Sequence, residues 1–231
     1  MSEPNTTVAD PTNTPPGGSS SSSSGTNPLK NALGGSAGRS LGLVVALGLL
    51  VAVGAITSGD RFLNVENWLT ILRYASILGV VSIGVTFVIT AGGIDLSVGS
   101  VLGLATVVAS LTSVQLAATQ SSWLLMVLVA LAVGAGVGLL NGVVIAYGNV
   151  VAFIATLATL VGARGLAELI SGRSTQIVTN RDFSKAMRGE FLGIPVLVWI
   201  FILAAAVGWF LLNRTTFGRR TVAIGGNREA A

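Results

Sequence analysis

The sequence predicts an all-α, polytopic membrane protein with about six transmembrane helices. Hydrophobic residues make up 52% of the chain, charged residues only 10%, and the mean hydropathy is +0.80, which no ordinary soluble domain reaches. Four long stretches contain no Lys, Arg, Asp or Glu: 40–59, 74–94, 96–163 and 191–213. A helix needs about 20 apolar residues to cross a bilayer, and these stretches lack the strict alternation of a membrane strand. Helices are therefore predicted rather than a barrel.

The chain is predicted to begin with a disordered cytoplasmic tail over residues 1–38. This part is rich in Ser, Thr, Pro and Gly, includes the unbroken run Ser19–Ser24, and has no apolar set that could form a core. The apolar run that follows could be a signal peptide. The long polar segment before it and the later spans favour an uncleaved first helix, so the membrane domain is placed at 39–212 and a cytoplasmic segment at 213–231.

Polar interruptions divide the longest uncharged stretch into three pieces. They lie at 112–122 and 147–149, and one helix of that length would far exceed the bilayer. The predicted spans are 41–57, 76–91, 98–111, 123–147, 150–170 and 194–212.

Basic residues predict that both ends of the chain are cytoplasmic. They precede the first predicted span and follow the sixth, at Lys30, Arg39, Arg214, Arg219, Arg220 and Arg228. The loop 171–190 carries four more basic residues, offset only in part by Asp182 and Glu190, and yet lies outside in this scheme. It is the weakest point of the predicted orientation.

The residue inventory excludes most catalytic chemistry. The chain has no Cys and no His, so disulfides, thiolate metal sites and the commonest general base are absent. No nucleotide-binding GxxxxGK[ST] motif occurs. We therefore predict no metal, no cofactor and no enzymatic activity. Nucleic acid is not a predicted partner either, because the basic residues lie between hydrophobic spans.

The segment TAGGIDLSVGS, residues 90–100, predicts a helix break at membrane depth. Gly92 and Gly93 loosen a helix end, and Asp95 is a single acid between two apolar runs. Two interpretations stay open. Asp95 could lie in the first turn of the next helix and cap its N–H groups, or it could form, with both glycines and Ser97, a polar hinge at a translocation path.

Two further features of the spans have a structural and a functional interpretation. Asn141 is an amide inside a predicted helix, and such amides usually bond to a neighbouring helix, although contact with a substrate is the alternative. Small residues recur every fourth position of the same span and predict close helix packing: Gly134, Gly138 and Gly142. Arg164 and Glu168 are spaced to form an ion pair on one helix.

Three segments resemble the ribose/xylose type of sugar permease, the membrane subunit of bacterial ABC importers in the branched-chain amino acid/sugar permease superfamily. They are VTFVITAGGIDLSVGSVLGLATVVAS (85–110), GLLNGVVIAYGNVVAFIATLATLVGARGLAELISG (138–172) and NRTTFGRRTVAIGGNREAA (213–231). The resemblance runs from about Asn64 to the last residue. It implies an inner-membrane permease that forms a homodimer or heterodimer, two cytosolic ATP-binding subunits that hydrolyse ATP, and an extracytoplasmic binding protein that delivers a monosaccharide.

The resemblance also implies that residues 213–231 form part of a loop that couples the permease to the ATPase. The residues it assigns to that contact are Gly218, Arg219, Gly225, Asn227, Glu229 and Ala230. A simpler account of the arginines is that they retain this end in the cytoplasm. The charged segments 60–73 and 171–190 could present their charges to such a binding protein, because complementary charges suit a transient contact.

Family permeases continue with about four more helices, so the resemblance implies a chain truncated inside the coupling loop. An inactive fragment is therefore an open alternative. A second alternative is an ion-coupled secondary transporter with Asp95 as the coupling carboxylate. A membrane protease is disfavoured because Ser97 would need a base that the chain does not provide.

Overall fold

The structure, a computed structural model, describes residues 36–226. The tail predicted for 1–38 lies outside these residues except at its end, where helix α2 (Ser36–Ser58) already begins. Asn227, Glu229 and Ala230 also lie outside them. The chain divides into two units, 1–59 and 60–231, and in the first unit the described residues form α2 alone.

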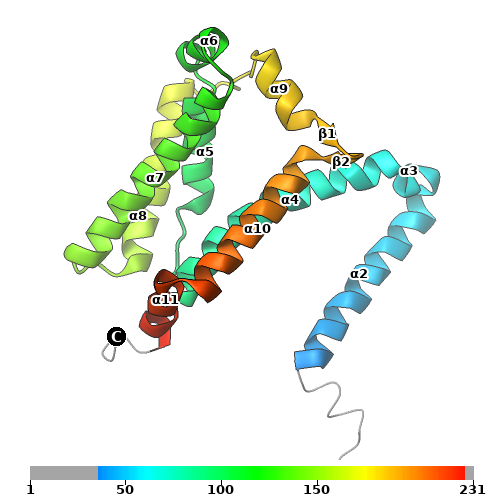
Figure 1. Ribbon diagram of the computed structural model, residues 1–231, viewed down its shortest axis with the longest axis horizontal. Helices are drawn as coiled ribbons and strands as arrows, with labels where there is room; N and C mark the ends of the chain where they lie inside the picture. Colours follow the sequence, from blue (N-terminus) through cyan, green and yellow to red (C-terminus); the bar gives the residue numbers. More distant parts are fainter. Residues whose placement is uncertain (1–35, 227–231) are drawn as a thin grey trace, which may run out of the picture. The chain divides into compact units, whose positions relative to one another are not determined.

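The second unit contains the remaining helices and one short hairpin, labelled in Figure 1. Its helices are α3 (Asp60–Leu63), α4 (Val65–Thr90), α5 (Val98–Ala109), α6 (Thr112–Gln120), α7 (Leu124–Tyr147), α8 (Ala152–Ser171), α9 (Arg181–Arg188), α10 (Val196–Arg214) and α11 (Thr216–Gly226). The antiparallel hairpin pairs β1 (Glu190–Phe191) with β2 (Ile194–Pro195).

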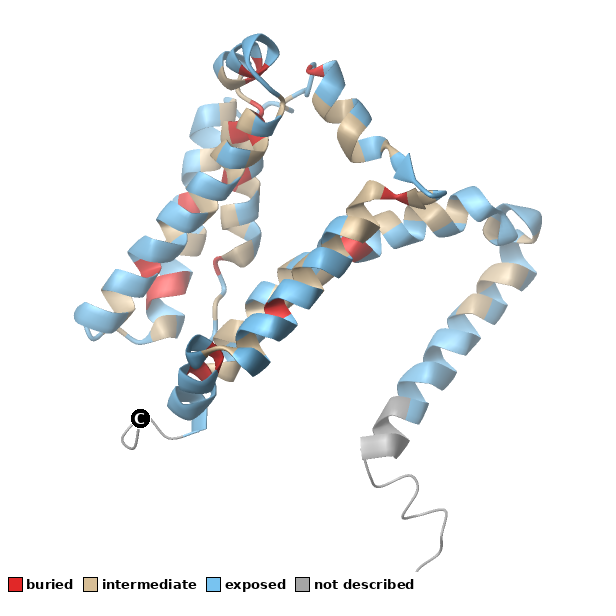
Figure 2. Cartoon of the chain, viewed as in Figure 1, coloured by how far each residue is buried: buried red, intermediate tan, exposed pale blue. Residues whose placement is uncertain are grey.

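Five of the described helices are long and apolar enough to cross a membrane, namely α2, α4, α7, α8 and α10. A sixth crossing exists if α5 and α6, which meet at a bend of 58°, count as one broken span. Few side chains are buried, and most large apolar ones are exposed (Figure 2), which suits a protein whose solvent is lipid. The predicted all-α, polytopic fold is confirmed.

The span predicted at 98–111 corresponds to α5, which begins at the predicted residue and ends two residues earlier. Helix α5 ends at Ala109, and α6 starts at Thr112 in a different direction. Twelve residues of α-helix are about 18 Å long, too short for a bilayer core of about 30 Å.

Helices α4 and α10 lie side by side and approach closely at two glycines (Figure 1). A Cβ at Gly79 would lie 2.5 Å from the ring of Phe201, and one at Gly208 would lie 2.8 Å from Cγ2 of Ile83. Helix α4 is also joined to the hairpin that precedes α10. The guanidinium of Arg73 on α4 lies 2.8 Å from the carboxylate of Glu190 on β1. Small residues therefore set this helix contact, as expected in lipid.

Replacing Gly79 by valine is expected to destabilise the protein by about 1–3 kcal/mol more than replacing Gly84 by valine, because overpacking displaces neighbouring side chains. The two glycines lie on the same helix, and a Cβ at Gly84 would have no atom within 4 Å. The intrinsic helix cost of valine is thus common to both variants. Thermal unfolding in detergent measures the difference, and equal midpoints would contradict the packing described here.

The glycine row of α7 has a different environment from that predicted. Cβ atoms at Gly134, Gly138 and Gly142 would have no atom of the described chain within 4 Å. No helix backbone within residues 36–226 therefore uses this row for close approach, and its packing role stays a prediction. Gly134 and Gly138 instead line a cavity described below.

Helices α5, α7 and α8 pack together through small buried side chains, among them Ala105, Ala109 and Ala155. Gln115 of α6, only 6% exposed, connects this group to the segment before α9. Its amide nitrogen donates to the carbonyls of Ser110 (2.7 Å) and Ile177 (3.0 Å). Its amide oxygen accepts from the backbone N–H groups of Thr179 (2.7 Å) and Asn180 (3.2 Å) and from the Thr179 hydroxyl.

Candidate functional site

Helix α4 ends in a glycine-dependent cap at the predicted break. The N–H of Gly93 donates to the carbonyl of Val88, and the N–H of Gly92 donates to that of Ile89, both at 2.9 Å. This pair of bonds is the Schellman pattern, which needs a left-handed residue, and Gly92 has φ +74°. The prediction that Gly92 and Gly93 terminate the helix is confirmed.

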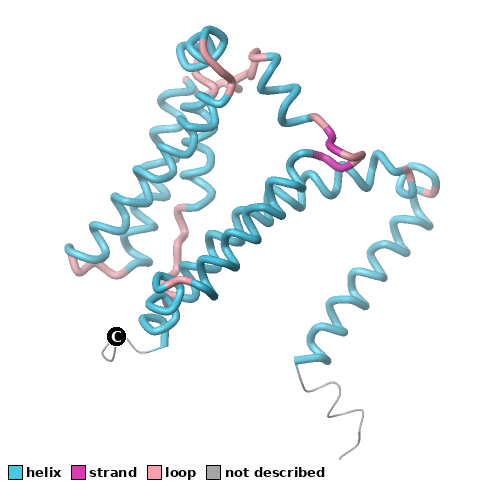
Figure 3. Tube along the Cα trace, viewed as in Figure 1, coloured by secondary structure: helices cyan, strands magenta, loops and turns pink. Residues whose placement is uncertain are grey.

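The chain then runs without helical structure from Gly93 to Ser97 before α5 begins (Figure 3). Thr156 of α8 bonds to this segment twice: its hydroxyl donates to the carbonyl of Ile94 and accepts from the N–H of Leu96, each at 3.3 Å. Backbone groups at membrane depth need such partners because lipid offers none.

Asp95 does not occupy the first turn of α5, contrary to one of the two interpretations above. It lies two residues before the N-cap Ser97, and the first turn of α5 contains no acid. Its Oδ1 accepts from the Ser97 N–H at 2.8 Å and from the Ser97 hydroxyl at 2.6 Å. The carboxylate therefore fixes the turn that leads into α5 instead of capping the N–H groups of the helix itself.

A chain of side-chain hydrogen bonds continues from Ser97 into α7 and α8. The amide nitrogen of Asn141 donates to the Ser97 hydroxyl at 3.3 Å, and the Thr159 hydroxyl donates to the Asn141 amide oxygen at 2.5 Å. Ser97 is 1% exposed and Asn141 is 8% exposed. The predicted role of Asn141 in bonding neighbouring helices is confirmed, and the site residues Asp95, Ser97 and Asn141 lie together.

These three residues line a cavity of about 630 Å³ between α4, α5 and α7. The rest of its wall is almost entirely Val, Leu, Ala and Gly, with Thr106 as the remaining polar side chain. The cavity thus has an apolar wall and a small polar cluster that includes a carboxylate, which is the usual composition of a small-molecule site.

The predicted coupling residues that the structure describes lie on or against α11. Gly218 is buried, and a Cβ there would overlap the carbonyl of Leu212. Arg219 and its neighbour Arg220 are exposed. Gly225 faces the end of α4, where a Cβ would overlap the carbonyl oxygen of Thr90. The structure thus brings α11 onto the helix break at Gly92, which the sequence did not predict.

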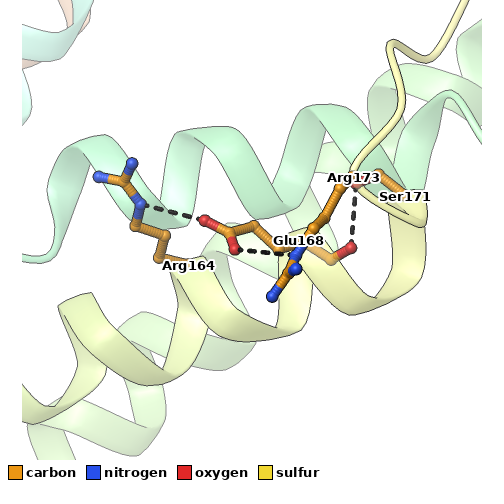
Figure 4. A network of polar contacts seen from close by, with 4 residues as sticks. All are labelled: Arg164, Glu168, Ser171 and Arg173. Atoms are coloured by element: carbon orange, nitrogen blue, oxygen red, sulfur yellow. Dashed lines mark hydrogen bonds and ion pairs between the residues drawn. The ribbon is translucent and has the colours of Figure 1, made fainter.

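The predicted ion pair on α8 is present and extends to the following loop (Figure 4). Nε of Arg164 lies 3.4 Å from Oε1 of Glu168, and Nε of Arg173 lies 3.8 Å from Oε2 of the same carboxylate. The three side chains are well exposed, so the pairs contribute little to stability. They bring two positive charges and one negative charge together at the end of the span.

Sequence reasoning missed two hydroxyl groups of this site, those of Thr156 and Thr159. Both lie inside an apolar span and are spaced three residues apart on one face of α8. A polar pair on one face of a membrane helix is a signal for contact with a neighbouring helix. This pair of threonines could have shown which face of α8 contacts the broken segment. It could not have shown which residues bond to that face.

Residues 67–231 match the family described as "Branched-chain amino acid transport system / permease component". The match covers most of the chain, including the break, the polar cluster and α11. The chain belongs to this family. The resemblance drawn from the three sequence segments is thereby confirmed, and the helical, multi-pass architecture of this permease family agrees with the structure.

Individual permeases of the family align with about two thirds of the chain. The Haemophilus influenzae protein named ribose import permease protein RbsC is 42% identical over 156 residues, which are 65% of this chain and 47% of that protein. The Bacillus subtilis protein of the same name is 40% identical over 66% of this chain and 47% of its own length. The Escherichia coli L-arabinose transport system permease protein AraH is 37% identical, with 66% and 45% covered.

The chain therefore spans about half the length of the permeases that it matches. No solved structure matches it.

Proposed function

We propose that this chain is a membrane-spanning permease subunit of an ATP-driven ABC importer that moves a monosaccharide across the inner membrane. One observation carries the proposal. The part of the chain that matches the permease family includes the helix break and the residues that line the cavity. The relatives named above transport ribose or arabinose by name. A pentose or a related sugar is accordingly the proposed substrate.

The cavity between α4, α5 and α7 is proposed as part of the translocation path. Carboxylate, amide and hydroxyl groups such as those of Asp95, Asn141 and Ser97 form hydrogen bonds with sugar hydroxyls. The largely apolar remainder of the wall favours weak binding and release. Similar proteins are named as import permeases, one of them as an ABC transporter permease, so secondary transport is not favoured.

The proposed partners are a cytosolic ATP-binding subunit that hydrolyses ATP, a second permease subunit and an extracytoplasmic sugar-binding protein. Both chain ends are proposed to be cytoplasmic. The exposed Arg219 and Arg220 of α11 support contact with the ATPase. On the opposite side the charged helix α9 and the Arg73–Glu190 pair belong to the segments proposed to face the binding protein.

Reversing the charge at both Arg219 and Arg220 to glutamate is expected to reduce recovery of the ATP-binding subunit by at least about tenfold, because like charges replace favourable contacts at the interface. The full chain is co-expressed with the ATP-binding subunit and purified through a tag on the chain. The ATPase recovered per chain is then measured. A chain that ends at Leu212 sets the background.

The matched control reverses Arg181 and Arg188 of α9, which are also exposed but lie on the proposed outer side. Its recovery of the ATPase should equal that of the unaltered chain. Equal recovery from the Arg219/Arg220 variant, or loss only in the α9 variant, would contradict both the proposed contact and the proposed orientation.

A further inference from the structure

Helix α11 contacts the end of α4 at two places, and one of them is a contact of backbone with backbone. The rings of Phe217 and Phe87 lie 6.1 Å apart between centroids. Further along α11, Gly225 lies against the last turn of α4, where any Cβ would overlap the carbonyl oxygen of Thr90. From the other side, a Cβ at Gly92 would lie 3.5 Å from the Cα of Gly225.

A side chain at 225 has no space in this contact, whereas a Cβ at Gly92 would make an ordinary van der Waals contact with Gly225. The atoms that a larger residue at 225 would meet belong to the backbone of α4, which cannot rotate away as a side chain can. Gly92 in turn needs its positive φ to end α4. Two glycines thus allow α11 to lie directly on the point where α4 ends and the broken segment begins.

The contact is close to the polar cluster along the chain. Gly92 is separated from Asp95 by two residues, and the intervening backbone is held by Thr156. Closely packed interiors transmit a displacement because they have little free volume to absorb it. A movement of α11 would therefore reach the first residues of the break directly. Transmission through Gly218 would instead have to pass along the whole of α10.

We propose that Gly225 is a positioning residue that links α11 to the helix break, so that displacement of α11 shifts the Gly92–Ser97 segment. The inference rests on the proposed function in one respect: the force that displaces α11 is supplied by the ATP-binding subunit. The contact itself does not depend on that partner, and the two parts can be tested separately.

The first experiment measures the position of α11 in the chain alone, without the ATPase. The chain has no cysteine, so spin labels can be placed at Tyr74→Cys in the first half of α4 and at Val222→Cys on α11, both exposed positions. We expect Gly225→Ala to shift the label distance by about 1.5 Å and to broaden it, since a carbon–oxygen overlap must relax to van der Waals contact.

The matched control is Gly226→Ala, the neighbouring glycine at the end of α11, where a Cβ would have no atom of residues 36–226 within 4 Å. This variant is expected to reproduce the distance distribution of the unaltered chain. Distributions for Gly225→Ala and Gly226→Ala that superimpose would overturn the proposal. This outcome is independent of whether the chain binds any ATPase.

The second experiment measures transmission in the assembled complex with the ATP-binding subunit. A single cysteine at Ile94, which is 58% exposed, is labelled with a maleimide before and after addition of ATP. We expect ATP to change the labelling rate in the unaltered chain, and Gly225→Ala to reduce that change at least about fivefold, the lower end of typical coupling strengths. The amount of bound ATPase is measured in the same samples, and the ATP-dependent change is compared per bound ATPase.

An ATP-dependent change that persists fully in Gly225→Ala would overturn the transmission role. Failure of the unaltered chain to bind the ATPase would instead contradict the proposed function, while the label distances would still decide whether Gly225 positions α11. The two failures are therefore distinguishable.

Discussion

Replacing Asp95 by alanine is expected to lower the free energy of unfolding by about 2 kcal/mol, whereas Asp95→Asn should lose less than half of that amount. Oδ1 of Asp95 accepts two hydrogen bonds from Ser97, and bonds to a charged acceptor contribute about 1.5–3 kcal/mol. Asparagine retains an acceptor oxygen in the same place. Alanine leaves the Ser97 N–H without its partner at a position that is 1% exposed.

Thermal unfolding in detergent measures stability, and sugar uptake by the assembled importer measures function. Asp95→Asn separates the two interpretations of the acid, because it keeps the turn and removes the charge. If the turn is what matters, uptake by Asp95→Asn stays near that of the unaltered protein and Asp95→Ala loses it. Equal loss of uptake in both variants, with Asp95→Asn still stable, would show that the negative charge itself is required.

Local sequence chemistry was sufficient to predict the helix break. Two glycines, an acid and a serine in an apolar context can hardly continue a membrane helix, and the structure has the cap and the extended segment there. The register of α5 was less predictable. One of the two interpretations left open by the sequence placed Asp95 in its first turn, but Asp95 bonds to Ser97 before the helix begins.

Contacts between distant segments could not be predicted from the sequence. Asn141 was recognisable as an amide that needs a partner, but Ser97 and Thr159 became its partners only through the packing of α5, α7 and α8. The approach of α11 to the break depends on how α10 returns along α4. Hydropathy predicts which helices enter the membrane, but it does not predict which of them become neighbours.

Polar sequence within the uncharged stretch was the second source of error, because it was treated as loop. The stretch from Leu96 to Ala163 contains no charge, and its polar interruptions were treated as loops between spans. One of these interruptions is helix α6, and it contains Gln115, whose five hydrogen bonds were not anticipated. A polar residue in a short linking helix resembles an ordinary solvated residue until its partners are known.

Replacing Gln115 by leucine is expected to lower the free energy of unfolding by about 3 kcal/mol, because it leaves two backbone N–H groups and two carbonyls without their side-chain partner. Leucine has a similar volume, so the loss is one of hydrogen bonds and not of packing. For a chain of this size the expected fall in the unfolding midpoint is about 6–12 °C. The same substitution at Gln120, an exposed glutamine of the same helix, is the matched control and should have little effect.

The loss at Gln115 should also be local, since two of its bonds join α6 to the backbone N–H groups of Thr179 and Asn180 and a third joins it to the Thr179 hydroxyl. Asn180 caps α9 by accepting from the N–H of Phe183 at 3.0 Å, so release of this backbone weakens the start of α9. Hydrogen exchange over residues 177–188 is therefore expected to accelerate in Gln115→Leu and to stay unchanged in Gln120→Leu. Uniform acceleration across all helices would mean that Gln115 supports the fold as a whole and does not act through the segment before α9.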